Sequence, residues 1–179
     1  IIHSIMKLQQ IFPRIIGEAH FNFDLLDDIN KIRDNPSGTP KRWVSNKTYS
    51  TFGKDLWDYP SFHPFLEWQD SQVTTYCKDQ NIKFEQFNCQ SWFNIYTKGD
   101  FQETHNHNIS GQHLSTIYMC KGPTGSAYTY FSDFQIQDQY RFEFEEGTLL
   151  IFPSHMLHGV SQHELDDERI TIASNYKLT

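Results

Sequence analysis

The residues best suited to chemistry lie in the second half of the chain, where a single residue separates His105 from His107. Side chains two positions apart in a β-strand project from the same face, so both imidazoles can reach one metal ion. His158, which follows the apolar run Ile151-Phe152 and a proline, can supply a third ligand. Imidazole suits first-row metals, and Fe(II) is commonly held by ligands on one face with the other face open. An isolated His-X-His is a weak signal, but the three histidines together predict a metal centre.

Arg169 follows His158 by eleven residues and opens a segment, 169–175, in which polar and apolar residues alternate. A strand with one face toward a cavity has this pattern, and it would place Arg169 and Thr171 on that face. A guanidinium binds a carboxylate through two parallel hydrogen bonds, and a hydroxyl two residues along can add a third. The segment therefore predicts an anchor for a carboxylate-bearing ligand beside the metal. Taken alone, Arg169 would better fit a surface pair with the acidic loop Glu164–Glu168.

Two tyrosines, Tyr96 and Tyr118, fall on expected strands that flank the histidine pair, so their phenols could donate hydrogen bonds to the same ligand. They fit ordinary core tyrosines about equally well. His113 lies six residues after His107 and could also reach the site. Of the other histidines, His63 is expected at the surface or at a helix cap, His155 is expected to point away from the site, and His163 is expected to be solvated.

The rest of the chain must position these residues, and its two halves differ in the periodicity of their apolar residues. Residues 23–33 carry Leu and Ile at helical spacing, with Asp24 as a candidate N-cap, and the run stops at the Pro- and Gly-containing segment 35–40. Residues 62–80 repeat apolar side chains with a period of about 3.6 residues and predict a second helix. The aromatic stretch 43–57 between them predicts a loop or short strand that could cover the site.

From residue 83 onward the pattern changes to short strands separated by turns, which is typical of an antiparallel sandwich or jelly roll. We therefore predict a mainly β fold with N-terminal helices, in one domain that spans 1–179. Helical support would occupy about 1–82 and the β core about 83–179. The expected strands are Glu85–Thr97, Leu114–Cys120, Ala127–Ser132, Tyr140–Phe144, Thr148–Phe152, His158–Gln162 and Arg169–Tyr176.

Composition restricts the classes of function. The 179 residues carry 15 basic and 22 acidic side chains, a formal net charge of −7, with no basic stripe. Nucleic-acid binding relies on clustered positive charge, so this balance argues against a nucleic-acid partner. Three cysteines without CxxC spacing predict reduced thiols in an intracellular protein. No apolar stretch reaches the roughly 18 residues of a membrane span, and no secretory pattern precedes Met6, which reads as a natural start. A cytoplasmic location without membrane association is expected.

Seven short motifs occur in the order seen in the 2-oxoglutarate/Fe(II)-dependent oxygenases, and the ordered set is much more specific than any one motif. The chain most closely resembles the small oxygenases of marine phages and bacteria, over roughly Glu85–Tyr176. The motifs are Trp92–Tyr96, Gly99-Asp100, His105–His107, Leu114–Tyr118, Gly147–Ser154, His158–Val160 and Arg169–Asn175.

This resemblance implies a double-stranded β-helix, a cupin-like distorted jelly roll, that uses Fe(II), 2-oxoglutarate and O2. It implies that His105 and His158 hold the iron, that Arg169 with Thr171 holds the distal carboxylate of 2-oxoglutarate, and that the keto-acid end chelates the metal. Hydroxylation of a substrate C–H bond is the expected outcome. Family analogues act on peptidyl proline, other protein side chains, small metabolites and nucleobases, so the substrate stays open. If the chain is phage-encoded, the host-cell cytoplasm is its expected location.

The chain departs from most of this family at one ligand, because His107 stands where an aspartate or glutamate usually follows the first histidine. A neutral imidazole would leave the iron one charge unit more positive than a carboxylate does. Asp100 or Glu103 could supply a carboxylate if the loop before His105 folds back. The spacing favours His107 as the ligand, and loss of activity is a further alternative.

Two other classes of function fit part of the pattern. One is a three-histidine, cupin-like dioxygenase or isomerase that needs no keto acid and does not use Arg169 as an anchor. The other is a non-enzymatic β-sandwich binding module whose histidines are incidental. Succinate release from 2-oxoglutarate separates the first from the family expectation, and stoichiometric metal retention separates the second.

Overall fold

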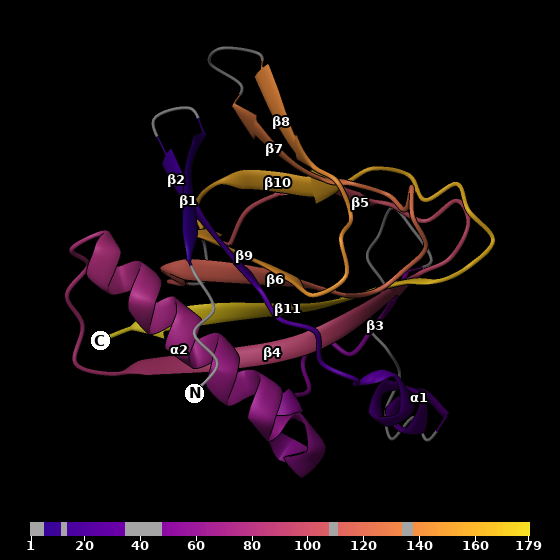
Figure 1. Ribbon diagram of the computed structural model, residues 1–179, viewed down its shortest axis with the longest axis horizontal. Helices are drawn as coiled ribbons and strands as arrows, with labels where there is room; N and C mark the ends of the chain where they lie inside the picture. The colour runs from indigo at the N-terminus through magenta and orange to yellow at the C-terminus, as the bar shows by residue number, and fades with distance from the viewer. Residues whose placement is uncertain (1–5, 12–13, 35–47, 108–110, 134–137) are drawn as a thin grey trace.

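The computed structural model describes residues 6–11, 14–34, 48–107, 111–133 and 138–179, which form two antiparallel β-sheets with helices on one side (Figure 1). The larger sheet has the strand order β1-β2-β9-β6-β11-β4-β3, so strands far apart in the sequence are neighbours in it. Its strands are β1 Lys7–Ile11, β2 Arg14–His20, β3 Tyr49–Ser50, β4 Phe87–Tyr96, β6 Leu114–Lys121, β9 Thr148–Pro153 and β11 Arg169–Leu178.

The smaller sheet has the order β5-β10-β7-β8 and faces one side of the larger sheet. Two sheets whose strands alternate along the chain in this way make a double-stranded β-helix, as predicted. The strands of the smaller sheet are β5 Gln102–His105, β7 Thr129–Asp133, β8 Asp138–Phe142 and β10 Leu157–Val160.

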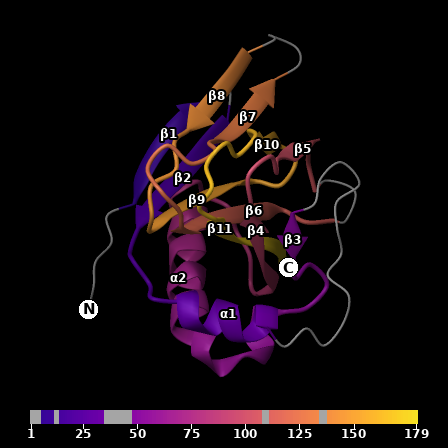
Figure 2. The same ribbon diagram turned by 90° about the vertical axis from the view of Figure 1, so that its right-hand side faces the viewer.

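The two faces of the larger sheet pack against different layers, because alternate residues of a strand point to opposite sides. On one face, side chains such as Phe93 and Ile172 join a buried apolar cluster with Phe65 and Val73 of helix α2, His63–Asp79. On the other face, the cluster is shared with the smaller sheet and includes Ile117, Leu150, Phe131 and Phe142. Figure 2 shows this layering, with α2 below the larger sheet and β7 and β8 above it. Polar residues on the second face can therefore be enclosed between the sheets.

Both predicted helices are present, as α1 Leu26–Asp34 and α2, and two short 3-10 helices, η1 Leu56–Asp58 and η2 Pro60–Phe62, precede α2. All seven predicted strands are present with small shifts at their ends. The segment 43–57 contains the short strand β3, which pairs with β4, while residues 43–47 lie outside the described residues.

The structure adds two strands in the first half of the chain that the sequence patterns did not predict. β1 and β2 form a hairpin, and β2 pairs with β9 through Gly17–Ile151 and neighbouring positions. The first 82 residues therefore contribute strands as well as helices to the fold. Strand β5, which carries His105, was also missed because it is only four residues long.

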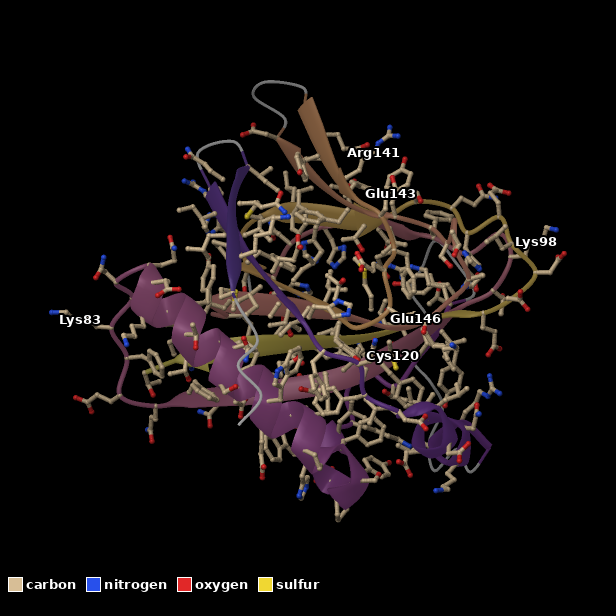
Figure 3. All side chains as sticks on the ribbon, in the orientation of Figure 1. Lys83, Lys98, Cys120, Arg141, Glu143 and Glu146 are labelled. Atoms are coloured by element: carbon tan, nitrogen blue, oxygen red, sulfur yellow. The ribbon has the colours of Figure 1, made fainter. Side chains whose placement is uncertain are left out.

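Charged side chains extend outward from the surface, and the three cysteines are free thiols. Figure 3 shows Lys83 and Lys98 extending outward from opposite ends of the molecule, with side chains filling the space between the sheets. The cysteines Cys77, Cys89 and Cys120 are all free thiols. Burial raises the pKa of Cys77 to about 11 and the pKa values of Cys89 and Cys120 to about 12, so all three stay protonated near neutral pH. Within the described residues, no helix has both the length and the apolar character needed to cross a membrane.

Candidate metal centre and co-substrate pocket

Two histidines of the smaller sheet and a third just beyond its strand β5 converge at one point between the sheets. His105 ends β5 and lies directly opposite His158 of β10, and His107 follows two residues after β5 ends. The ring centres are 4.4 Å apart for His105 and His158, 5.0 Å for His105 and His107, and 5.3 Å for His107 and His158. One ligand nitrogen from each ring lies within 4.8 Å of the other two. This spacing can accommodate one metal ion bound by all three.

Two of the rings have their tautomer fixed by backbone carbonyls. His105 Nδ1 is 2.8 Å from the Glu103 carbonyl oxygen, and His158 Nδ1 is 2.9 Å from that of Met156. A carbonyl oxygen can only accept, so Nδ1 of each ring carries the proton and donates it. In a neutral ring, Nε2 then presents the lone pair, which is the arrangement that a metal-binding histidine requires.

The environment of the cluster favours neutral imidazoles. Burial lowers the pKa of His158 well below its usual value, and the neighbouring His105 ring adds to this effect. Burial, followed by the charge of His105, lowers the pKa of His107 to about 4. Burial also lowers the pKa of His105, although its hydrogen bond to the Glu103 carbonyl opposes the shift. Metals bind the deprotonated imidazole, so the cluster is prepared for a cation at neutral pH.

The structure brings His107, and neither of the two candidate carboxylates, into this cluster. The backbone N–H of His107 donates to the Ser154 carbonyl at 2.9 Å, which ties it to the turn before β10. The Asp100 carboxylate instead accepts hydrogen bonds from the Thr97 N–H and hydroxyl at 2.8 and 2.9 Å and closes its own turn. Within the described part of the chain, the only cluster of potential ligands contains the three histidines, and Glu103 is not in it.

Arg169, the first residue of β11, is completely buried. Its Nε donates to the Ala127 carbonyl at 2.9 Å and its Nη2 donates to the Thr129 hydroxyl at 3.2 Å. The guanidinium carbon lies 4.9 Å from the centre of the Tyr96 ring and 5.1 Å from that of Phe144. Among the residues that the structure describes, Nη1 has no hydrogen-bond partner. Burial lowers the pKa of Arg169 to about 10, so the side chain is a cation at neutral pH that is surrounded by rings and neutral oxygens.

A cavity between the sheets connects the histidines with the residues around Arg169. Its lining includes Tyr96, Asn94 and Thr171, while Arg169 packs against Tyr96 next to it. Asn94 lies opposite Thr171 on the neighbouring strand and is 6% exposed, and its side-chain oxygen has no hydrogen-bond partner within the described ranges. Burial raises the pKa of Tyr96, so its phenol remains a hydrogen-bond donor. The pocket thus contains several polar groups suited to a polar ligand.

Tyr118 does not belong to this pocket, and its prediction as a co-substrate residue is wrong. Its ring lies on the helix-facing side of the larger sheet, in the cluster that includes Phe65. The phenol donates to the Phe21 carbonyl and accepts from the Phe23 N–H, both at 3.0 Å. Tyr118 is on β6, where the side chains that face the cavity are those of Ser115 and Ile117, one position out of phase.

Two other histidines also differ from expectation or lie apart from the site. His163 is completely buried rather than solvated: its Nδ1 accepts from the Ala127 N–H at 3.3 Å and its Nε2 donates to the Asp167 carbonyl at 2.7 Å. His163 therefore links the acidic loop 164–168 to the backbone of Ala127. His113 accepts from the Leu178 N–H at 2.9 Å and is not part of the metal cluster.

Sequence reasoning overlooked Asn94, Asn175 and Thr129 as residues of the site. The alternation of side chains along a strand could have identified two of them. It places Asn94 on the same face as Tyr96, and Asn175 on the same face as Thr171. Thr129 could not have been found in this way, since its contact with Arg169 joins strands from different sheets.

Comparisons with known proteins agree with this geometry. The family model described as "Putative 2OG-Fe(II) oxygenase" matches residues 90–175, which include the three histidines and Arg169. Over residues 90–175 the chain therefore matches a family of 2-oxoglutarate/Fe(II)-dependent oxygenases, in agreement with the resemblance of the sequence motifs. No curated protein matches.

Several solved structures share the fold at low sequence identity. A prolyl-4-hydroxylase from Pseudomonas putida is 14% identical, with 87% of this chain and 84% of that chain covered and a TM-score of 0.67. A Trichoplax adhaerens prolyl hydroxylase in complex with a hypoxia inducible factor peptide is 12% identical, with 86% and 76% covered and a TM-score of 0.61. HygX from Streptomyces hygroscopicus, with nickel and 2-oxoglutarate bound, is 10% identical, with 92% and 83% covered and a TM-score of 0.62.

Proposed function

We propose that this protein is a hydroxylase in which His105, His107 and His158 hold Fe(II), and Arg169 with Thr171 holds the distal carboxylate of 2-oxoglutarate. The observation that carries this proposal is the fully buried guanidinium of Arg169, whose Nη1 finds no hydrogen-bond partner in the described part of the chain. A buried cation without a counter-charge is unfavourable. An anionic carboxylate would neutralise it and accept a charge-assisted hydrogen bond.

The spacing of the two parts of the pocket suits a short dicarboxylate. The Arg169 guanidinium bonds to Thr129, which pairs with Val160 of β10, two residues beyond His158. Two residues along a strand correspond to about 7 Å. A ligand with a carboxylate at each end of a short carbon chain could therefore contact Arg169 and the histidine cluster together.

Each group of residues in the site would have a separate role in the reaction. When bound, Fe(II) and 2-oxoglutarate supply the oxidising chemistry that activates O2 and inserts one oxygen into a substrate C–H bond. The three imidazoles fix the cation on one face, and Arg169 and Thr171 orient the co-substrate. The apolar walls, which include Trp92, Ile117 and Phe152, exclude water from the reaction space.

For the substrate, we propose a protein or peptide side chain such as proline. Support comes from the structural likeness to two prolyl hydroxylases, one of them in complex with a peptide, and from the net charge of −7, which disfavours nucleic acid. We also propose a cytoplasmic location, because the cysteines are free thiols. A phage origin is a prediction from the sequence resemblance alone.

Succinate release tests the proposal against the keto-acid-independent alternative. Protein loaded anaerobically with Fe(II) is mixed with 2-oxoglutarate, air and a library of proline-containing peptides, and succinate is measured. Iron-dependent succinate formation that rises with a peptide and yields a product heavier by one oxygen atom is expected. Oxidation of a substrate without any need for 2-oxoglutarate would instead establish the three-histidine dioxygenase class.

A further inference from the structure

A buried chain of polar side chains leads away from the third histidine of the cluster. The side-chain nitrogen Nδ2 of Asn175 lies 3.4 Å from His107 Nδ1. The Ser115 hydroxyl donates to Asn175 Oδ1 at 2.8 Å and is 2.9 Å from the Ser154 hydroxyl. Asn175, Ser115 and Ser154 are 6%, 2% and 0% exposed. Ser154 also accepts the backbone N–H of His107 through its carbonyl, so this chain begins and ends at the same histidine.

The partner of His107 differs in kind from the partners of the other two rings. His105 and His158 each face a backbone carbonyl, which can only accept. His107 faces a side-chain amide, which can either donate or accept, depending on which of its two ends is turned toward the ring. With Nδ2 turned toward the ring, the Asn175 amide donates to His107 Nδ1, and the neutral ring then carries its proton on Nε2.

Metal binding at Nε2 of His107 requires the opposite arrangement. The ring proton must then sit on Nδ1 and needs an acceptor. A half-turn of the Asn175 amide supplies Oδ1 as that acceptor and turns Nδ2 toward Ser115. Hydroxyl groups both donate and accept, so Ser115 can then accept from Asn175 and donate to Ser154 without the loss of a hydrogen bond. The direction of every hydrogen bond in this series, from His107 to Ser154, can therefore reverse.

We propose that Asn175, braced by Ser115 and Ser154, is a positioning residue that allows His107 to act as the third metal ligand. This inference rests on the metal centre of the proposed function. A carboxylate can bind a metal through either of two oxygens, whereas an imidazole binds through one nitrogen in one tautomer. A site that uses histidine at this position therefore needs a partner that sets the ring's tautomer and orientation, and Asn175 is the side chain placed to do so.

The test measures Co(II) affinity by calorimetry, and coordination geometry by the ligand-field absorption of Co(II), on the full chain with the metal alone as the probe. Asn175→Leu removes the acceptor and should weaken Co(II) binding about 10- to 100-fold and change the absorption spectrum. Asn175→Asp supplies a permanent acceptor and should bind Co(II) at least as tightly as the wild type. Ser115→Ala, which leaves the amide less firmly held, should weaken binding by a smaller factor.

Ser174→Ala is the matched control, because Ser174 neighbours Asn175 on β11 but bonds to Gln69 and Ser91 on the other face of the sheet. It should lower the melting temperature and leave Co(II) affinity unchanged. Wild-type affinity and spectrum in Asn175→Leu would overturn the proposal, as would equal weakening in Asn175→Leu and Asn175→Asp, which would indicate packing alone. If Asn175→Leu does not fold, wild-type affinity in Ser115→Ala together with weakening in Asn175→Asp would overturn it. Failure of the wild type to bind Co(II) would overturn the metal centre itself, and this inference with it.

Discussion

At the scale of single residues, the candidate site combines three neutral imidazoles with one buried cation, Arg169, for which the described residues supply no counter-charge. Burial depresses the pKa of each histidine in the cluster, while Arg169 stays charged and keeps an unpartnered N–H. The sequence predicted these four residues from their spacing and types. It could not predict that Tyr118 faces the helices, because the phase of β6 relative to the cavity depends on how the sheets pack.

Arg169→Ala should weaken 2-oxoglutarate binding roughly 100-fold or more and leave metal affinity nearly unchanged, because it removes a charge-assisted hydrogen bond to the co-substrate and no metal ligand. Calorimetry with Ni(II)-loaded protein measures both affinities. Thr171→Val is the milder companion variant, and it should cost about 10-fold in 2-oxoglutarate affinity. Equal loss of metal and 2-oxoglutarate binding in Arg169→Ala would contradict the anchor role.

His107→Asp should retain stoichiometric metal and lower the Fe(III)/Fe(II) reduction potential, since a carboxylate places one more negative charge next to the cation and favours the higher oxidation state. A spectroscopic redox titration measures this shift. His158→Ala is the control and should abolish stoichiometric metal binding, because it removes a fully enclosed ligand. Iron retained at full occupancy in His158→Ala would contradict the site as described.

At the scale of elements, the pairing of β5 with β10 sets His105 directly opposite His158 and so brings two of the proposed metal ligands together. Strand periodicity predicted β10 and β11, but β5 is too short for its alternation to be read, and β1 and β2 have mostly polar or partly exposed residues. Their place in the larger sheet comes from pairing between β2 and β9, which are far apart in sequence. Such long-range pairing is not visible in a local pattern.

Gly159, between His158 and Val160, is required by the close approach of β5. A Cβ built there would lie 2.8 Å from the Gln102 carbonyl oxygen and would collide with the Tyr130 hydroxyl. Gly159→Ala should therefore push β5 away from β10, cost about 1–3 kcal/mol of stability, and weaken metal binding. Thermal unfolding and metal titration measure the two effects.

Adding Tyr130→Ala to Gly159→Ala separates the two collisions. It removes the clash with the ring but not the one with the β5 backbone, so stability should recover in part while metal binding stays weak. Full recovery of metal binding in the double variant would show that the approach of β5 does not depend on the glycine.

At the scale of the whole molecule, a helix-covered sheet and a smaller sheet enclose a cavity that is lined by both polar and apolar side chains. Sequence patterning predicted the class of fold and the jelly-roll architecture, since the change from helical to alternating periodicity near residue 83 is strong. The enclosure of His163 and the position of the α2 layer depend on tertiary packing and were accessible only from the structure.

The metal-free protein should lose stability as the pH falls below about 6.5. The unfolded chain protonates its histidines near that value, whereas the folded cluster resists protonation, and the pKa of His107 is lowered to about 4. Stability linked to His107 is therefore present above pH 6.5 and is lost as the pH falls toward 4, by up to about 3 kcal/mol. Urea unfolding across this range measures the loss, and His107→Gln should flatten it. An unchanged slope in His107→Gln would show that the histidine is not the source.

A crystal structure of the protein with Mn(II) and 2-oxoglutarate, in which anomalous scattering locates the metal, would show both parts of the proposed site at once. We expect one anomalous peak bonded to His105, His107 and His158, and a carboxylate of 2-oxoglutarate paired with Nη1 of Arg169. A metal bound elsewhere, or a 2-oxoglutarate carboxylate away from Arg169, would contradict the proposed site.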